Sequence, residues 1–484
     1  MSFRIASAVE ASRGRRITAE ARAAFDAAAA AVERRRQRRG RQRMEVRQEA
    51  GRTVVRGDIP PDLEVKPGQA FLFLSRDQSA YTHGLHKYPA KFFPELPRWL
   101  VRRYSRKGSR VLDPFTGSGT TNVEALLAGR PSTGVDVDPF SRFLAGTKVT
   151  PIDPALASLA ALVLVDATFR YASSRRKPAR VPQFPYREGW FREHVLDELA
   201  YVKREIDELP GRLPSRFSDG DARSVQRLML AAFSSIIRAS SNADDHCTRT
   251  VVRKRLGKEV PPGFVLERFR HSVVSASLGM EEFTRACPRG VAVEIPEDCD
   301  AKRIRARAST FSLAVTSPPY CNAVDYPRTH QLEMYWLGIA EGRLSPLKRA
   351  HVGTEVVRVD EYKELHETGV EEADRVIAGL FEKDRRRSFI LYKYLVDMES
   401  NLREVHRVLR PGARYCIAVG NNLMRGFDVE NWRYITALGE RVGFELELHF
   451  SSEIIRHFIK VPRRERIMRD WVIVLRKRRR PGPG

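Results

Sequence analysis

Residues 109–137 read SRVLDPFTGSGTTNVEALLAGRPSTGVDV, and this stretch decides the fold. Residues 110–113 predict a strand, and the Gly-Ser-Gly at 117–119 predicts a turn directly after it. Residues 120–128 place their apolar side chains on one face of a helix, and a second strand is expected at 133–137. A strand, turn, helix and strand in this order form a βαβ unit with parallel strands and a right-handed crossover. The sequence therefore predicts an α/β fold.

The α/β alternation continues in the second half of the chain. An apolar strand is expected at 311–316. Apolar residues three and four apart between 395 and 409 form one stripe along a helix, and a strand follows at 415–419. Segments 444–450 and 471–475 are expected to supply a closing pair of strands. These elements extend the βαβ unit into a large sheet.

Composition divides the chain into an arm, a core and an insertion. Residues 1–60 are rich in Ala, Arg and Glu and predict a basic helix or, alternatively, a partly disordered arm. Residues 151–289 look mainly helical and interrupt the alternation for longer than a loop would. The core is then expected at 61–150 and 290–478, with the insertion between its two parts.

The charge balance favours a nucleic-acid partner. Lys and Arg total 85 against 60 Asp and Glu, a formal charge of +25. Such a protein binds polyanions by releasing their counterions, although a generally Arg-rich proteome would give the same balance. The five cysteines form no CxxC pair, so neither a metal site nor a disulfide framework is indicated. No long apolar run occurs, and we expect a soluble, cytoplasmic, nucleoid-associated protein.

Residues 113–121, DPFTGSGTT, place a carboxylate at a strand end and two glycines in the following turn. Glycines there let a ligand approach the backbone, so a nucleoside-type cofactor is expected. The string is neither GxGxxG nor GxxxxGK[ST], which argues against a dinucleotide or phosphate loop.

Two strings together resemble one enzyme family. DPFTGSGTT at 113–121 is similar to the cofactor motif of DNA amino-methyltransferases, and TSPPY at 316–320 resembles their catalytic motif. HKYPAKF at 86–92 resembles the segment that precedes the cofactor motif in this family. DYPR at 325–328 resembles a continuation found in a subset of the family. Arg328 would hold a phosphate or the extruded nucleotide, although Asp325 is as well suited to capping a helix.

The resemblance implies a Rossmann-like, seven-stranded class I methyltransferase sheet that binds S-adenosylmethionine. Asp113 would accept the ammonium of the cofactor's methionine, and Asp136 would hold its ribose hydroxyls. Asp300 resembles the acid that contacts the adenine amine, and Gly117 and Gly119 would leave room for the methionine end. The implied cofactor-binding set is Pro89, Asp113, Phe115, Gly117, Gly119, Thr120, Asp136 and Asp300.

The catalytic string fits methyl transfer to an aromatic exocyclic amine. The lone pair of such an amine is delocalised into the ring, so an enzyme must accept hydrogen bonds from the NH2 group to make it nucleophilic. Ser317 and the Pro318 carbonyl are suitable acceptors. Pro319 stiffens the loop with Pro318, and Tyr320 offers a face on which a flipped base of double-stranded DNA can stack.

Ser317 points to cytosine N4 as the target, because the family's adenine-N6 enzymes typically carry Asp at that position. Adenine N6 remains the first alternative. An RNA guanine-N2 enzyme or a catalytically silent DNA-binding relative is a second one. Cytosine C5 chemistry needs a nucleophilic cysteine after proline, and no Pro-Cys occurs. Target recognition is expected in 151–289, or else in 327–390.

Overall fold

A computed structural model describes residues 17–40, 44–75, 77–174, 180–253, 257–321, 324–454 and 469–479. Within these ranges, ten strands form one mixed sheet in the order β1-β2-β3-β11-β12-β8-β7-β4-β5-β6. The strands are β1 (Glu45–Glu49), β2 (Arg52–Arg56), β3 (Ala70–Leu74), β4 (Val111–Asp113), β5 (Ser132–Gly134), β6 (Val293–Glu294), β7 (Phe311–Thr316), β8 (Leu409–Gly420), β11 (Phe444–Glu453) and β12 (Arg469–Lys477).

Seven of these strands, from β6 to β11 in the sheet order, make the predicted seven-stranded core. β6, β5, β4, β7 and β8 run parallel, and β12 is antiparallel to both β8 and β11. The βαβ unit at 110–137 and the closing pair near the C-terminus both form as predicted. This arrangement confirms the Rossmann-like, mostly parallel α/β fold.

The boundary predicted at residue 60 is wrong, because the sheet continues into the N-terminal arm. β1 and β2 pair antiparallel, and β3 lies parallel to both β2 and β11. Val54, Val55 and Phe71 are buried in this extension. Residues 45–56 therefore belong to the sheet rather than to a free arm.

Helices cover both faces of the sheet. α3 (Glu95–Tyr104) and α4 (Thr120–Leu127) lie on one face, where Trp99 and Leu100 join the apolar layer beneath them. The opposite face is covered by α16 (Arg385–Val408) and α17 (Asn431–Val442), and α15 (Glu371–Lys383) packs on α16. The stripe predicted between 395 and 409 lies on α16, where Leu395, Met398 and Leu402 are fully buried.

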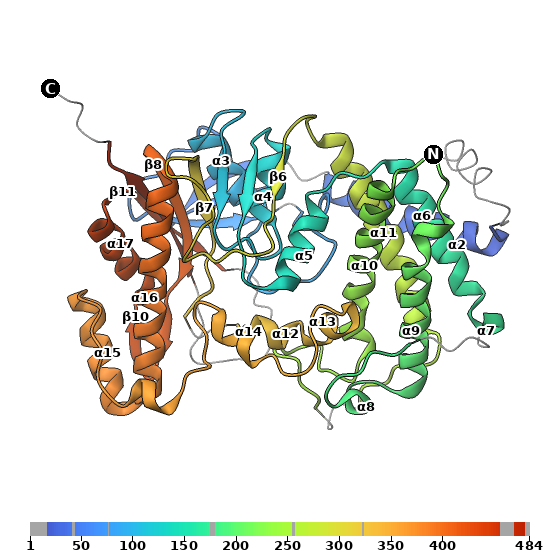
Figure 1. Cartoon of the computed structure of the whole chain (residues 1–484). Helices are drawn as coiled ribbons and strands as arrows, with labels where there is room; N and C mark the ends of the chain where they lie inside the picture. Colours follow the sequence, from blue (N-terminus) through green and yellow to red (C-terminus); the bar gives the residue numbers. More distant parts are fainter. Residues whose placement is uncertain are drawn as a thin grey trace.

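The segment between β5 and β6 forms a helical lobe beside the sheet (Figure 1). Its main helices are α5 (Pro139–Lys148), α6 (Pro154–Phe169), α9 (Glu193–Asp207), α10 (Asp219–Ser240) and α11 (Phe264–Ala286). α2 (Ala19–Gly40), from the predicted arm, packs on α6 and α11 through Phe25. None of the described helices is long and apolar enough to cross a bilayer.

Three short helices follow the catalytic string and pass below the sheet toward the lobe (Figure 1). They are α12 (Tyr326–Thr329), α13 (Gln331–Leu337) and α14 (Ser345–Ala350). Trp336 of α13 meets Phe191 and Phe233 of the lobe edge to face, at ring-centroid distances of 6.0 and 6.1 Å. The chain after the catalytic string is thereby anchored in the helical lobe.

Candidate active site

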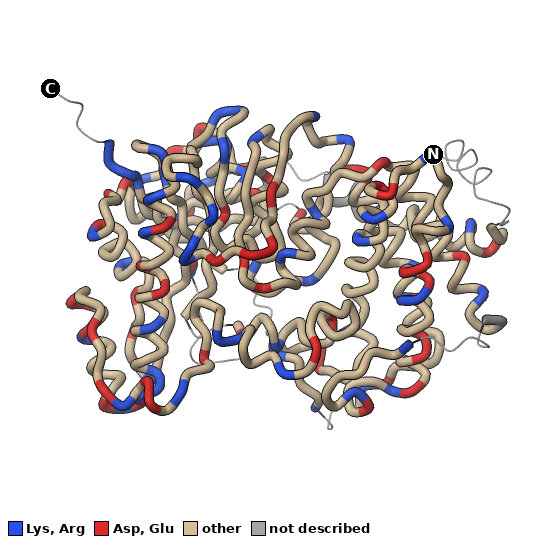
Figure 2. Tube along the Cα trace, viewed as in Figure 1, with Lys and Arg blue, Asp and Glu red and all other residues tan. Residues whose placement is uncertain are grey.

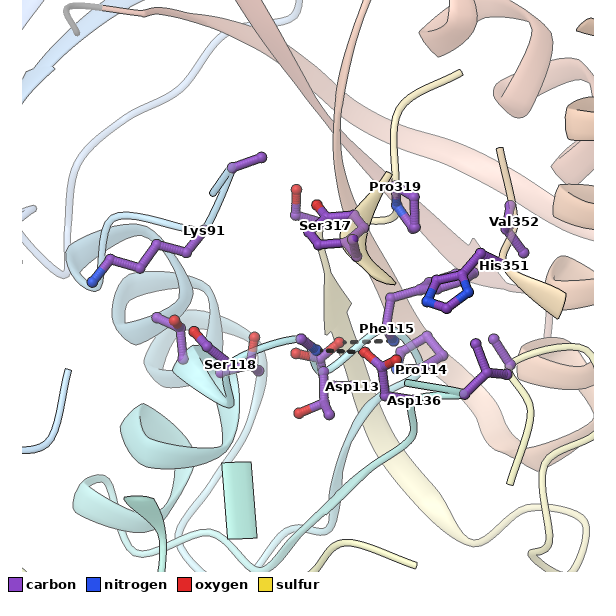
Figure 3. Close-up of a pocket in the computed structure, with 18 of the residues that line it drawn as sticks. Lys91, Asp113, Pro114, Phe115, Ser118, Asp136, Ser317, Pro319, His351 and Val352 are labelled. Atoms are coloured by element: carbon purple, nitrogen blue, oxygen red, sulfur yellow. Dashed lines mark hydrogen bonds between the residues drawn. The ribbon is translucent and has the colours of Figure 1, made fainter. Parts of the chain in front are cut away.

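A cleft of about 760 Å³ opens at the carboxyl ends of β4, β5 and β7. Ser317 and Pro319 lie on one side of it, across from Asp113 and Asp136, and His351 stands at one end (Figure 3). Ends of parallel strands are the usual ligand position in open α/β sheets. Of the residues predicted from the sequence, those lining the cleft are Asp113, Phe115, Gly117, Thr120, Asp136, Asp300, Ser317 and Pro319.

Asp113 ends β4 and is 3% exposed. Its Oδ1 accepts hydrogen bonds from Thr316 Oγ1 at 2.6 Å and from the Phe115 amide at 3.1 Å. Burial raises the pKa of Asp113 to about 6, despite these hydrogen bonds and one from Thr121. The carboxylate is surrounded by neutral donors and is suited to receive a cation.

Asp136 follows β5 and is joined to the glycine turn. Its Oδ2 accepts from the Gly117 amide at 2.9 Å, and its Oδ1 accepts from the Asp138 amide at 2.8 Å. Burial raises the pKa of Asp136 to about 6, and the charge of Asp138 adds to this effect. Two carboxylates thus enter one cleft from neighbouring strands.

The two glycines of the turn serve different purposes. Gly117 has a positive φ of 49° and lines the cleft. Gly119 has a φ of 80° and begins α4, but a Cβ added there would lie 2.9 Å from the Ala145 Cα on α5. Gly119 is therefore needed for close packing of α4 against α5, and it is not one of the residues that line the cleft.

The segment at 86–92 borders the cleft, which Tyr88 and Ala90 line. Pro89, which was predicted to bind the cofactor, is not one of the lining residues. Tyr88 Oη lies 2.8 Å from Ser141 Oγ, and its ring stacks on Tyr326 at 5.4 Å between centroids. Asp300 lines the cleft while its Oδ1 accepts from the Lys302 amide at 2.8 Å.

The catalytic string turns out of β7 at Thr316. Ser317 and Pro319 line the cleft, whereas Pro318 is buried and Tyr320 lies beyond the lining residues. Tyr320 Oη donates a 2.7 Å hydrogen bond to Asp470 Oδ1 at the start of β12. The string is therefore held by a strand that follows it by 150 positions.

The sequence did not indicate the pair formed by His351 and Asp138. His351 lines the cleft, and its Nε2 lies 3.5 Å from Asp138 Oδ2. Burial alone would lower the pKa of His351, but Asp138 raises it above the usual histidine value. Asp138 also caps α5 through the Phe140 and Ser141 amides. The histidine reaches the cleft from the loop after α14, far from both motifs, so no local signal marked it.

Asp325 caps α12, accepting from the Arg328 amide at 3.1 Å. Its Oδ2 also accepts from Lys348 Nζ at 3.0 Å. The capping alternative for Asp325 is thus confirmed.

The cleft residues fit a nucleoside cofactor that carries an ammonium group. Asp113 and Asp136 offer carboxylates, and Asp300 offers a third beside them. Ser118 Oγ is buried at the cleft and has no hydrogen-bond partner among the described residues. A buried hydroxyl without a partner is costly unless a ligand supplies one. These groups suit S-adenosylmethionine, whose ammonium and ribose hydroxyls need such acceptors.

Comparison with known proteins agrees with this geometry. Residues 33–142 match the family model described as DNA methylase, N6_N4_Mtase. The type II methyltransferase M.MvaI of Kocuria varians is 25% identical over 74% of this chain and 80% of its own length. M.BsoBI of Geobacillus stearothermophilus, another type II methyltransferase, is 24% identical over 75% of this chain and 78% of its own length.

Among solved structures, a SAM-dependent methyltransferase from Methanosarcina mazei aligns with 82% of this chain and 100% of its own length. Its sequence identity is 10% and its TM-score 0.28. Type II DNA methyltransferases are therefore distant relatives of this chain, and residues 33–142 carry the N6/N4 DNA methylase pattern.

Proposed function

We propose that this S-adenosylmethionine-dependent DNA methyltransferase transfers a methyl group to the exocyclic N4 amine of cytosine in double-stranded DNA. The observation that carries the proposal is the position of Ser317, which lines the same cleft as Asp113 and Asp136. A hydroxyl acceptor thus stands beside a cofactor site formed by two carboxylates, which is the proximity that direct transfer requires.

The cofactor site is assigned to the cleft residues. When bound, S-adenosylmethionine supplies an electrophilic methyl group on its sulfonium. Asp113 would accept hydrogen bonds from its ammonium group, Asp136 from its ribose hydroxyls and Asp300 from its adenine amine. Phe115, Gly117 and Thr120 line the space between them.

The target amine is assigned to Ser317 and Pro318. Ser317 Oγ and the Pro318 carbonyl each accept one N–H of the amine, which returns electron density to nitrogen before the transfer. Buried Pro318 and half-buried Pro319 keep the carbonyl direction fixed. A serine in place of aspartate supports cytosine over adenine, and the Tyr320 ring is assigned as a surface for the flipped base.

DNA recognition is assigned to residues 151–289, the larger part of the helical lobe, with residues 327–390 as the second choice. Lys and Arg are spread over the sheet and the lobe and interspersed with acids (Figure 2). Phosphates are therefore expected to be held by particular cations near the cleft rather than by one continuous stripe.

Nucleoside mass spectrometry tests the proposal. The host would be a strain whose DNA contains neither N4-methylcytosine nor N6-methyladenine. It would express the wild-type protein, Ser317→Ala or the surface control Ser400→Ala on α16. N4-methylcytosine is expected with the wild type and with Ser400→Ala only. N6-methyladenine would move the target to adenine, and methylation by Ser317→Ala would overturn the role of Ser317. If neither methylated base appears, an RNA substrate or a catalytically silent relative would be favoured. Calorimetry of cofactor binding would distinguish these two.

A further inference from the structure

A second cleft lies directly beside the active-site cleft. It has a volume of about 400 Å³, within the range of small-ligand sites, and shares Tyr326, His351 and Val352 with the first cleft. The loop after α14 carries two of these residues and packs on the catalytic string. A Cβ added there at Gly353, whose φ is 77°, would lie 3.0 Å from the Tyr320 carbonyl oxygen. The second cleft therefore adjoins the place proposed for the target base.

Two cations line the second cleft, and each is paired with a carboxylate that also lines it. Arg249 of the helical lobe lies 3.3 Å from Glu355, and Lys348 of α14 lies 3.0 Å from Asp325. These four side chains are between 21% and 45% exposed. Ion pairs at such exposure contribute little to stability, because water competes for both partners. Another anion can therefore displace the two carboxylates at small cost.

Arg249 reaches the second cleft from a loop that is anchored on both sides of it. Thr250 is 1% exposed, and its Oγ1 donates to the Thr329 carbonyl at 2.8 Å. On the other side, the guanidinium of Arg238 donates to the Thr248 carbonyl at 3.0 Å. A side chain on a fixed backbone loses less conformational freedom when it binds a ligand. The planar guanidinium of Arg249 also matches the geometry of a phosphate.

His351 adds positive charge to the wall between the two clefts. Its Nδ1 lies 2.7 Å from the Leu347 carbonyl oxygen, which can only accept, so Nδ1 carries a proton. Its Nε2 lies 3.5 Å from Asp138 Oδ2, where a second proton gives an attraction between the two groups. Burial alone would lower the pKa of His351, but Asp138 raises it. Arg249, Lys348 and His351 thus give the second cleft three cationic groups among its described lining residues.

We infer that the second cleft binds the phosphate of the target nucleotide, and that Asp325 and Glu355 are counter-ions which this phosphate replaces when DNA binds. The inference rests on the proposed function, because that function brings a flipped base into the adjoining cleft. The phosphate of a nucleotide is attached to its sugar, so a base at Ser317 places a phosphate beyond the shared wall. Arg328, which the motif resemblance marks for a phosphate, is not among the described lining residues of either cleft. The contact is therefore assigned to the cations that do line the second cleft.

Glu355→Gln tests the inference most directly, because it removes a competitor of the phosphate rather than a contact to it. Methyl incorporation into unmodified genomic DNA, at saturating S-adenosylmethionine, would give KM and kcat for the DNA. Glu355→Gln should lower this KM about fivefold and leave kcat unchanged, because Arg249 no longer has to give up a carboxylate. A purely structural ion pair would not give a gain in affinity when it is broken.

Glu399→Gln is the matched control for Glu355→Gln. Glu399 of α16 lies 2.6 Å from Arg403 and 2.7 Å from Arg441, so it joins two arginines as Glu355 does. It is not among the described lining residues of either cleft. The two substitutions change the net charge equally, and Glu399→Gln should leave the KM for DNA at the wild-type value.

Two further variants test the cations themselves. Lys348→Ala should raise the KM for DNA about fivefold without a change in kcat, because it removes a contact to the phosphate. In a protein that already carries Arg249→Ala, Glu355→Gln should no longer lower KM, since the cation that it frees is missing. Denaturant unfolding would verify that each variant is folded.

The outcomes distinguish the phosphate site from the proposed function. A KM that Glu355→Gln does not lower, or that Glu399→Gln lowers equally, would overturn the phosphate site and leave the methyl transfer standing. Absence of methyl incorporation with the wild-type protein would overturn the proposed function instead. Fluorescence anisotropy with a labelled DNA duplex of random sequence would then decide about the second cleft alone. Tighter binding by Glu355→Gln than by the wild type and Glu399→Gln would support the phosphate site, and equal binding would refute it.

Discussion

Buried carboxylates have charged partners in the helical lobe and neutral partners at the carboxyl edge of the sheet. In the lobe, Asp166 pairs with Arg170 and accepts from the Thr18 amide, and Glu205 pairs with Arg212 at 2.5 Å. At the sheet edge, Asp113, Asp136 and Asp470 have neutral partners, namely hydroxyl and amide groups, and the pKa of each is raised to about 6 by desolvation.

This difference separates the carboxylates that stabilise the fold from those that are available to bind a ligand. A carboxylate that meets a cation or capped helix amides is compensated within the protein. One that meets only neutral donors keeps a desolvation cost that a cationic or proton-donating ligand can relieve. Substitutions in the lobe should therefore cost stability, and substitutions at the sheet edge should cost ligand binding.

Among the substitutions that test this comparison, Asp113→Asn should have the largest effect, on cofactor affinity. The amide keeps the size of the carboxylate but loses its charge, and a hydrogen bond to a charged group contributes about 1.5–3 kcal/mol. We expect the affinity for S-adenosylmethionine to fall ~100-fold, which corresponds to about 2.7 kcal/mol. Titration calorimetry measures this, and denaturant unfolding of the free protein should show no loss of stability.

Asp207→Asn, at the exposed C-terminal end of α9, is the control for Asp113→Asn and should bind the cofactor as the wild type does. Unchanged affinity in Asp113→Asn would remove the ammonium-binding role. A large loss of unfolding free energy would instead place Asp113 with the structural carboxylates.

Glu198→Ala should give the converse result in the helical lobe. Glu198 of α9 is 2% exposed and accepts from the Gly263 and Val265 amides at the start of α11, at 2.5 and 3.2 Å. Removing it uncaps α11 and leaves amides without their acceptor, so the free energy of unfolding should fall by about 2 kcal/mol. Denaturant unfolding measures this, and Glu198→Gln should recover part of the loss. Weakened cofactor binding with intact stability would contradict the comparison.

The sequence predicted the parts of the fold that depend on local pattern. The βαβ unit at 110–137 is a short strand, turn and helix whose periodicity is complete within 30 residues. The extension by β1, β2 and β3 was missed because, among the described strands, β3 joins the core through its pairing with β11, some 380 positions away. Such pairing leaves no local trace in strands of five residues, one of which, β1, is largely exposed.

The candidate site was predictable to the same extent. Asp113, Asp136 and Ser317 lie within or beside readable motifs, and the fold brings them to one cleft. Asp470 and His351 reach the site from β12 and from the loop after α14, where no neighbouring residue marks them. Gly119 packs α4 against α5, a contact that the motif alone did not indicate. Motifs predict residues that share a turn, whereas contacts made by closure of the sheet require the structure.

A pH series should change stability and cofactor affinity in opposite directions. The pKa of Asp113 and of Asp136 is about 6 in the folded protein, above the unfolded value near 4. Their contribution to stability is therefore full below about pH 4 and is lost as the pH rises through 6. The cofactor ammonium needs ionised Asp113, so affinity should rise about tenfold from pH 5 to 7. Calorimetry at the two values tests this, and a dependence that Asp113→Asn leaves intact would contradict it.

The smallest effect is expected from a substitution at the contact between the helical lobe and the sheet domain. Glu355 lies 3.3 Å from Arg249 of the helical lobe and 3.5 Å from Arg387 of α16. It lines the second cleft of about 400 Å³, which shares Tyr326, His351 and Val352 with the first. Because a DNA phosphate can take the place of this carboxylate, Arg249→Ala should weaken DNA binding by about 1 kcal/mol and lower the salt-dependence slope by about one.

Arg375→Ala, an exposed arginine of α15 paired with Glu371, is the control for Arg249→Ala and should leave the slope unchanged. Fluorescence anisotropy over a salt series measures both variants. Equal slopes for the two would mean that Arg249 serves only the ion pair with Glu355. The ion pairs of Glu355 would then belong with the compensated charges of the lobe. Phosphate binding would have to be sought on other cations around the cleft.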